Sequence, residues 1–131
     1  MSKPVLDIRF ITPEGKKGRA KAVLDSGSFY TIIRKNILPR GTKLITYKKR
    51  REFGTAGKRG KISVTDTARL ILVIGNRMID VPAFVSPDLR SDLLIGAEAM
   101  QSWNISIQNK NGKTTIRVGH DMRDPEITEV F

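Results

Sequence analysis

Alternation of apolar and polar residues along the chain predicts a fold built mainly from β-strands. In the stretch VLDIRFI at residues 5–11, Leu6, Ile8 and Phe10 fall on one side of the pleat, and polar residues separate them. Side chains two positions apart in a strand share a face. This stretch is therefore typical of a strand that turns one side toward a core.

Turn residues divide the rest of the chain into further strands and hairpins. The turn at residues 12–15 joins the first strand to a second at 17–24, and Asn111-Gly112 is a strong hairpin signal. The other expected elements are strands at 30–33, 43–53, 58–65, 68–74, 77–85, 91–96, 103–108 and 113–118, a helical turn at 34–38 and one short helix at 97–102. The pattern predicts a mostly β protein with a single short helix near the C-terminus.

The length of 131 residues suits one domain, and a hydrophobic content of 39% is enough for a modest core. We expect a single domain over residues 1–118 and a polar C-terminal tail over residues 119–131. No repeat of fixed period and no low-complexity segment interrupts this division.

The composition excludes several kinds of reactive site and argues against others. The chain has no cysteine, which excludes disulfides, thiolate nucleophiles and cysteine-based zinc sites. His120 is the single histidine, which argues against a His-rich metal site, so we expect no metal and no cofactor. Apolar stretches are too short for a signal peptide or a membrane span. We therefore expect a cytoplasmic protein without a membrane partner.

The formal charge of +11 indicates a possible anionic partner. Basic residues gather at 16–21, 48–51 and 58–61, and such clusters attract nucleic acid or an acidic protein. A solvated basic face is the alternative interpretation. Aromatic residues make up 6% of the chain and do not alternate with the basic clusters, which weakens a base-stacking interpretation.

The segment AVLDSGSFYTIIR at residues 22–34 carries the clearest candidate for chemistry. Asp25 ends an apolar strand and is followed by Ser26, Gly27 and Ser28. An aspartate at such a position is often only a turn former. A carboxylate this close to a core is otherwise held by hydrogen bonds or kept for a reaction.

Two motifs later in the chain favour a catalytic role for Asp25 over the role of a turn former. A hairpin tip of small residues occupies 54–57, and the apolar segment Leu-Leu-Ile-Gly at 93–96 leads into the expected helix. With the segment around Asp25, this ordered set resembles the retroviral-type aspartic proteases, the retropepsins, over roughly residues 5–108. The resemblance implies a closed β-barrel or sandwich with a flap hairpin.

The resemblance also implies an activity and its residues. Asp25 would be the catalytic residue, one from each chain of a homodimer, and the two carboxylates would activate a water that hydrolyses a peptide bond. Ser26 would bond across the two-fold axis. Gly27 would allow the tight loop and accept a hydrogen bond from the substrate, and Ser28 would orient the carboxylate.

Gly54, Thr55, Ala56 and Gly57 would form the tip of the flap that closes over the peptide. The alternative is an ordinary β-turn between two surface strands.

The chain departs from the family pattern at several positions. Ser28 stands where retropepsins more often have alanine, and Glu98 where they commonly have Asp or Asn. Pro125 lies in the segment that would supply an interleaved terminal strand, and proline cannot donate a ladder hydrogen bond. We therefore expect dimer contacts from the hairpin at residues 103–118 as an alternative.

Two other functions remain open from the sequence. One is a non-catalytic retropepsin-like module that uses its basic surface to bind nucleic acid or an acidic partner. The other is a small basic β-barrel that binds RNA.

Overall fold

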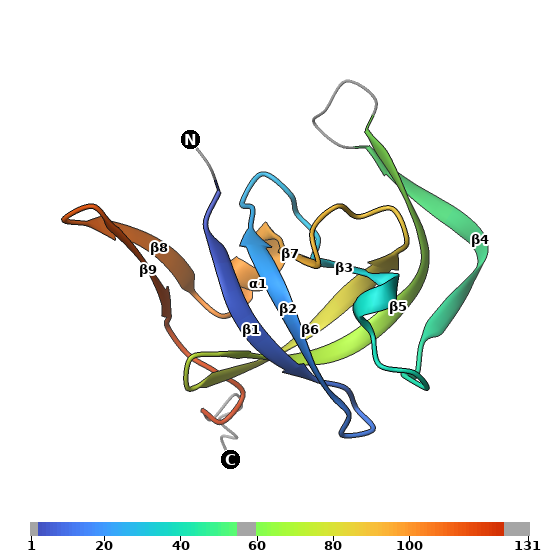
Figure 1. Cartoon of the computed structure of the whole chain (residues 1–131), viewed down its shortest axis with the longest axis horizontal. Coiled ribbons are helices and arrows are strands. Elements are labelled where there is room, and N and C mark those ends of the chain that lie inside the picture. The colour runs from blue at the N-terminus through green and yellow to red at the C-terminus, as the bar shows by residue number, and fades with distance from the viewer. Residues whose placement is uncertain (1–2, 55–59, 125–131) are drawn as a thin grey trace, which may run out of the picture.

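A closed β-barrel forms the body of the protein in a computed structural model that describes residues 3–54 and 60–124 (Figure 1). The strands are β1 (Val5–Ile11), β2 (Lys17–Leu24), β3 (Ile32–Arg34), β4 (Ile45–Gly54), β5 (Lys61–Ile74), β6 (Arg77–Ser86) and β7 (Leu93–Ile95). They pair in the order β1-β2-β7-β3-β6-β5, and β5 pairs back to β1 to close the ring. β4 lies outside the ring, paired to β5.

The remaining elements are a short 3-10 helix, an α-helix and a separate hairpin. The 3-10 helix is η1 (Lys35–Ile37), and α1 (Ala97–Ser102) follows β7 directly. The hairpin of β8 (Ile105–Lys110) and β9 (Lys113–Val118) follows α1 and projects from the barrel (Figure 1). The expected mostly β closed barrel with one short α-helix is confirmed.

The core follows the predicted alternation. Ile8 and Phe10 of β1 are buried, while Asp7 and Arg9, which alternate with them, are exposed. Phe10 pairs with Gly18 of β2, where a Cβ would lie 2.2 Å from the Phe10 ring. Because Gly18 has no side chain, β2 leaves room for Phe10, the largest fully buried side chain.

β5 is one continuous strand, whereas the sequence predicts two strands separated near Asp66. Asp66 is 5% exposed and accepts hydrogen bonds from the hydroxyls of Thr46 at 2.7 Å and Thr65 at 2.5 Å. Burial raises the pKa of Asp66, but these hydroxyls and the ammonium of Lys35 outweigh it and lower the pKa below its usual value. The expectation of a break was wrong because tertiary hydroxyl partners let a carboxylate stay inside the strand.

Residues 119–124 lie against the start of β6. The amide N–H of Met122 donates to the carbonyl of Met78 at 2.8 Å, and the N–H of Met78 donates to Asp121 Oδ2 at 3.0 Å. Asp121 is 1% exposed and also accepts two bonds from the Arg123 guanidinium, at 2.9 and 2.6 Å. The division between a domain at 1–118 and a tail at 119–131 stays a prediction, since residues 125–131 lie outside the described residues.

No helix among residues 3–54 and 60–124 combines the length and the apolar composition that crossing a membrane requires.

Asp121→Asn should destabilise the protein at neutral pH, because the Arg123 guanidinium and the Met78 N–H lower the pKa of Asp121 from 3.8 to about 2. A carboxyl with a depressed folded-state pKa stabilises the fold above its unfolded value and loses that contribution as pH falls through the folded value. The difference in urea unfolding midpoint between wild type and variant should therefore be largest above about pH 4 and should decrease toward pH 2.

The matched control for this prediction is Asp7→Asn, which makes the same chemical change at an exposed position of β1. A difference for Asp121→Asn that is no larger than the control's, or that does not change with pH, would contradict the prediction.

Candidate active site

Backbone pairing places Asp25 at the end of the barrel. β2 runs parallel to β7 with Leu24 opposite Ile95, and the N–H of Asp25 donates to the carbonyl of Ile95 at 2.9 Å. Leu24 is buried at 1% exposure, while the Asp25 side chain keeps 16%. The buried Leu24 therefore fixes the end of β2 in the core, and the carboxylate of the next residue, Asp25, remains partly accessible.

The loop after Asp25 is a tight turn closed on the carboxylate. The N–H of Gly27 donates to Asp25 Oδ1 at 3.0 Å, and the N–H of Ser28 donates to the Asp25 carbonyl at 3.1 Å. The Ser28 hydroxyl donates to the carbonyl of Tyr30 at 3.1 Å. In the single chain the Gly27 N–H, not the Ser28 hydroxyl, contacts the carboxylate, and the orienting role of Ser28 stays a prediction. Ser26 is exposed at the turn, and its role across a two-fold axis stays a prediction.

β7 and the residues after it hold the Asp25 loop through backbone pairing and hydrogen bonds. β7 lies between β2 and β3, parallel to the first and antiparallel to the second. Where α1 begins, the N–H groups of Ala97 and Glu98 donate to the carbonyls of Ser28 at 2.6 Å and Phe29 at 2.9 Å. The N–H of Gly96 donates to the buried hydroxyl of Thr31 at 3.2 Å. The expectation that the 93–96 segment lies beside the Asp25 loop and leads into the helix is confirmed.

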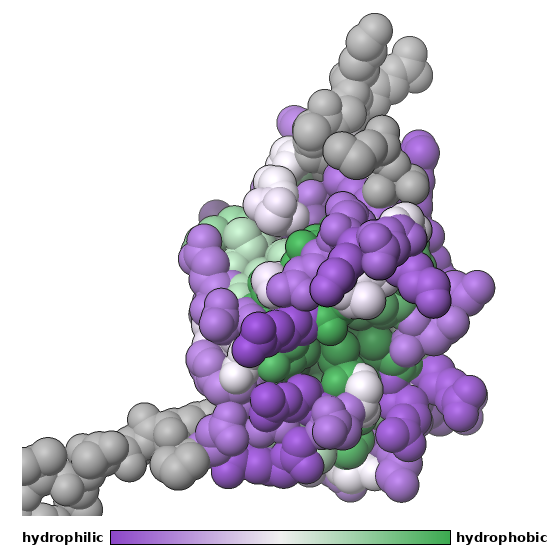
Figure 2. All heavy atoms as spheres, turned by 90° about the vertical axis from the view of Figure 1, so that its left-hand side faces the viewer, coloured by the Kyte–Doolittle hydropathy of each residue, from purple (hydrophilic) through white to green (hydrophobic). Residues whose placement is uncertain are grey.

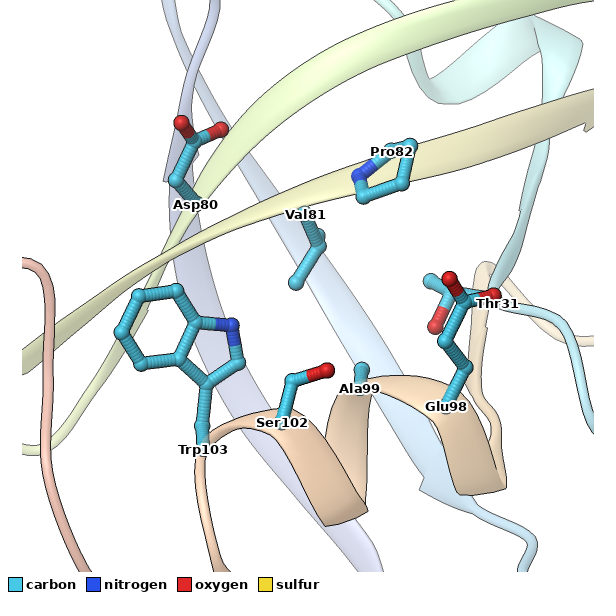
Figure 3. Close-up of a pocket in the computed structure, with 8 residues that line it drawn as sticks. All are labelled: Thr31, Asp80, Val81, Pro82, Glu98, Ala99, Ser102 and Trp103. Carbon is cyan, nitrogen blue, oxygen red and sulfur yellow. The ribbon is translucent and has the colours of Figure 1, made fainter. Parts of the chain in front are cut away.

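A small pocket of about 170 Å³ lies between α1 and β6 (Figure 3). Its lining residues are Thr31, Asp80, Val81, Pro82, Glu98, Ala99, Ser102 and Trp103. Glu98, the residue that departs from the family pattern, is exposed and lines this pocket beside Thr31 (Figure 3).

A cleft of about 1110 Å³ contains Asp25. Gly27 and Ser28 line it from the turn, and Gly54 lines it from the end of β4. The structure therefore brings four of the candidate residues to one cleft. Thr55, Ala56 and Gly57 lie outside the described residues, so the flap tip itself stays a prediction.

An aromatic wall closes one side of the cleft. Phe29 and Tyr30 follow the turn, and Tyr30 stacks on Phe53 of β4 with ring centroids 5.1 Å apart. Phe84 of β6 meets both Tyr30 and Phe53 edge to face at 5.0 Å. The Arg51 guanidinium lies 5.1 Å from the Phe53 centroid. These contacts tie β4 to the segment after the turn. Sequence analysis missed them because the rings come from three separate segments.

Sequence analysis also missed Lys3, whose Nζ lies 2.8 Å from Asp25 Oδ2. No local pattern connects a lysine near the N-terminus to a carboxylate twenty-two positions later. Other charged residues of the cleft include Glu52, Lys61 and Asp88. Within residues 3–54 and 60–124, no three His, Cys, Asp or Glu residues lie close enough to hold a metal ion.

Comparisons with known proteins agree with this architecture. A family model described as retroviral aspartyl protease matches residues 1–108. The structure resembles the retroviral protease-like domain of Ddi1 from Leishmania major, with 20% identity, a TM-score of 0.56, and coverage of 88% of this chain and 89% of that chain. It also resembles the EIAV protease complexed with the inhibitor HBY-793, with 12% identity, a TM-score of 0.52, and coverage of 79% and 89%. At these identities the two structures show a shared fold. No curated protein matches the chain.

Gly96→Ala should lower the free energy of unfolding by about 1–3 kcal/mol, the usual cost of overpacking. A Cβ at this position would lie 2.3 Å from the Tyr30 carbonyl oxygen and 2.7 Å from that of Phe29, and backbone atoms cannot rotate away as a side chain does. Chemical denaturation measures the loss.

Gly54→Ala is the matched control, because a Cβ there meets nothing within 4 Å. Equal stability of the two variants would refute the close approach of residue 96 to the Asp25 loop.

Proposed function

The chain belongs to the retroviral aspartyl protease family, and from this premise we propose that it is a homodimeric aspartic endopeptidase. The observation that carries the proposal is the position of Asp25. Its carboxylate sits on a tight turn, held by the N–H of Gly27, inside a cleft of about 1110 Å³. The cleft is large enough for several residues of a peptide.

The proposed chemistry needs two carboxylates that share one proton. Like charges this close cannot both ionise, so one carboxylate is a base and the other an acid. The base takes a proton from water as the water oxygen attacks the peptide carbonyl, and the acid gives its proton to the carbonyl oxygen. The leaving nitrogen takes a proton as the C–N bond breaks. The pair titrates as a unit.

A second copy of the chain supplies the second carboxylate in this proposal. Each chain has one Asp-Ser-Gly motif, so Asp25 would meet its equivalent across a two-fold axis. β8 and β9 pair only with each other within residues 3–54 and 60–124, which leaves strand edges available to a second copy. Figure 2 shows an apolar area bordered by polar side chains on the face that carries β1 and this hairpin. Val5, Leu6, Ile107 and Ile116 of these elements are exposed or half-buried.

The substrate in this proposal is an extended peptide. Gly54 continues into Thr55, Ala56 and Gly57, which we assign as the flap tip, with β4 and β5 as its arms. Small residues suit a tip that moves to admit a substrate and then excludes water. Phe29, the most exposed ring of the aromatic wall at 54%, provides apolar surface for a substrate side chain.

The second candidate is a binding module without catalysis. Its support is β4, where Lys48, Lys49 and Arg50 are all exposed on a strand outside the barrel. Such a row attracts nucleic acid or an acidic protein.

Asp25→Asn should abolish cleavage of an unfolded protein substrate between about pH 3 and 7, the range in which coupled carboxylates titrate. The expected loss is roughly 100- to 10,000-fold, because the amide can neither accept nor supply the shared proton. Glu14→Gln, at the exposed turn between β1 and β2, makes the same acid-to-amide change, is the control, and should keep wild-type activity.

Activity that survives Asp25→Asn would contradict the protease proposal. Inactive wild type in the presence of a stable dimer would favour the binding module.

Dimerisation should strengthen as salt is added. Two chains of +11 each bring 2 × 11 = +22 together, and salt screens this repulsion. Sedimentation equilibrium between about 0.05 and 0.5 M NaCl, which spans Debye lengths from more than 10 Å to a few Å, measures the trend.

The double variant Lys48→Gln/Lys49→Gln removes two charges per chain and should flatten the salt dependence. Dimerisation that weakens with salt would mean that attractive ion pairs, not net repulsion, govern the interface.

A further inference from the structure

Lys3, near the N-terminus of the chain, lies in the cleft beside Asp25. The Lys3 ammonium donates to Asp25 Oδ2 at 2.8 Å, and Lys3 is part of the cleft lining. The next residue is fixed as well, because the carbonyl of Pro4 accepts the N–H of Leu24 at 3.1 Å. Residues 3 and 4 therefore lie along the end of β2, with the ammonium directed at the carboxylate.

Both carboxylate oxygens of Asp25 are engaged within one chain. Oδ1 accepts the N–H of Gly27, and Oδ2 accepts the ammonium of Lys3. The first contact fixes the carboxylate on its loop and leaves it able to act. The second gives the carboxylate a cationic partner from its own chain.

A cation at this point opposes the proposed chemistry. A positive charge beside a carboxylate favours the ionised form. Two ammonium groups, one on each side of the two-fold axis, would favour two ionised carboxylates, whereas the reaction needs one proton between them. An active dimer therefore requires that Lys3 leave Asp25.

We propose that the Lys3–Asp25 ion pair is an autoinhibitory contact of the single chain, which breaks when two chains pair. This inference rests on the proposed function and assigns Lys3 as a positioning residue that acts through Asp25. It makes dimer formation a competition between the chain's own ammonium and the carboxylate of the second copy.

The Lys3–Asp25 ion pair is accessible to water and can therefore break at a small cost in free energy. The Lys3 side chain is 58% exposed and the Asp25 side chain 16%, so water replaces much of what the ion pair loses. Ion pairs of this kind typically change an equilibrium by roughly 1.4- to 5-fold. Two such pairs break per dimer, so their removal should tighten dimerisation roughly 2- to 25-fold.

The test measures the dimer dissociation constant of the full chain by sedimentation at one ionic strength. Lys3→Gln removes the ammonium and keeps a side chain of similar length. Lys17→Gln is the matched control, because it removes the same charge from an exposed lysine at the other end of β2. Lys3→Gln should dimerise more tightly than Lys17→Gln by the factor above, and Lys3→Arg should behave as wild type.

A double-mutant cycle separates the contact from general charge effects. In an Asp25→Asn background the advantage of Lys3→Gln over Lys17→Gln should disappear, since the partner of the ammonium is gone. Equal effects of the two lysine variants, an advantage that persists without the carboxylate, or the absence of any dimer for Lys3→Gln would each overturn the inference.

Peptide cleavage by the same samples separates this inference from the proposed function. Coupling between Lys3 and Asp25 without cleavage by any dimer would support the autoinhibitory contact and reject the protease. Cleavage by wild type without coupling would leave the protease in place and reject the contact.

Discussion

The insertion of β7 between β2 and β3 is the constraint on which the candidate site depends. β7 is only three residues long, yet it pairs on both sides and continues into α1 without a connecting loop. This arrangement brings Gly96 so close to the carbonyls of Phe29 and Tyr30 that no side chain fits between them. The loop that carries Asp25 is therefore supported by backbone from the far end of the sequence.

Backbone support explains how distant sequences share this architecture. The carbonyl of Ile95 holds Asp25, and the carbonyls of Ser28 and Phe29 are held by the first N–H groups after Gly96. None of these bonds depends on the type of side chain, apart from the glycine that permits the approach. Chains with 12% and 20% identity to this one can therefore retain the same fold while their surfaces and charges diverge.

The parts of the molecule that follow from local rules were predictable from the sequence. Alternation of apolar and polar residues predicted β1, and an aspartate with a glycine two positions later, after an apolar strand, marked the turn at Asp25. The contacts that were missed join distant segments. Asp66 stays within β5 because the hydroxyl of Thr46, from another strand, stabilises it. The pairing of Lys3 with Asp25 likewise depends on how the N-terminal residues meet the end of β2, which no sequence pattern records.

Two positive charges oppose the proposed chemistry: the net charge of the whole chain, which acts over a long range, and the Lys3 ammonium, which contacts Asp25 directly. The net charge repels a second chain over the whole surface, and this repulsion weakens when salt shortens the Debye length. The Lys3 ammonium acts over 2.8 Å on one carboxylate oxygen, a distance shorter than the Debye length at any of these salt concentrations. Salt therefore weakens the repulsion between the two chains far more than it weakens the Lys3–Asp25 ion pair. We expect that ion pair to break when another group replaces the ammonium. In the proposed dimer, the second copy's carboxylate, arriving with a proton to share, would both displace the ammonium and complete the pair.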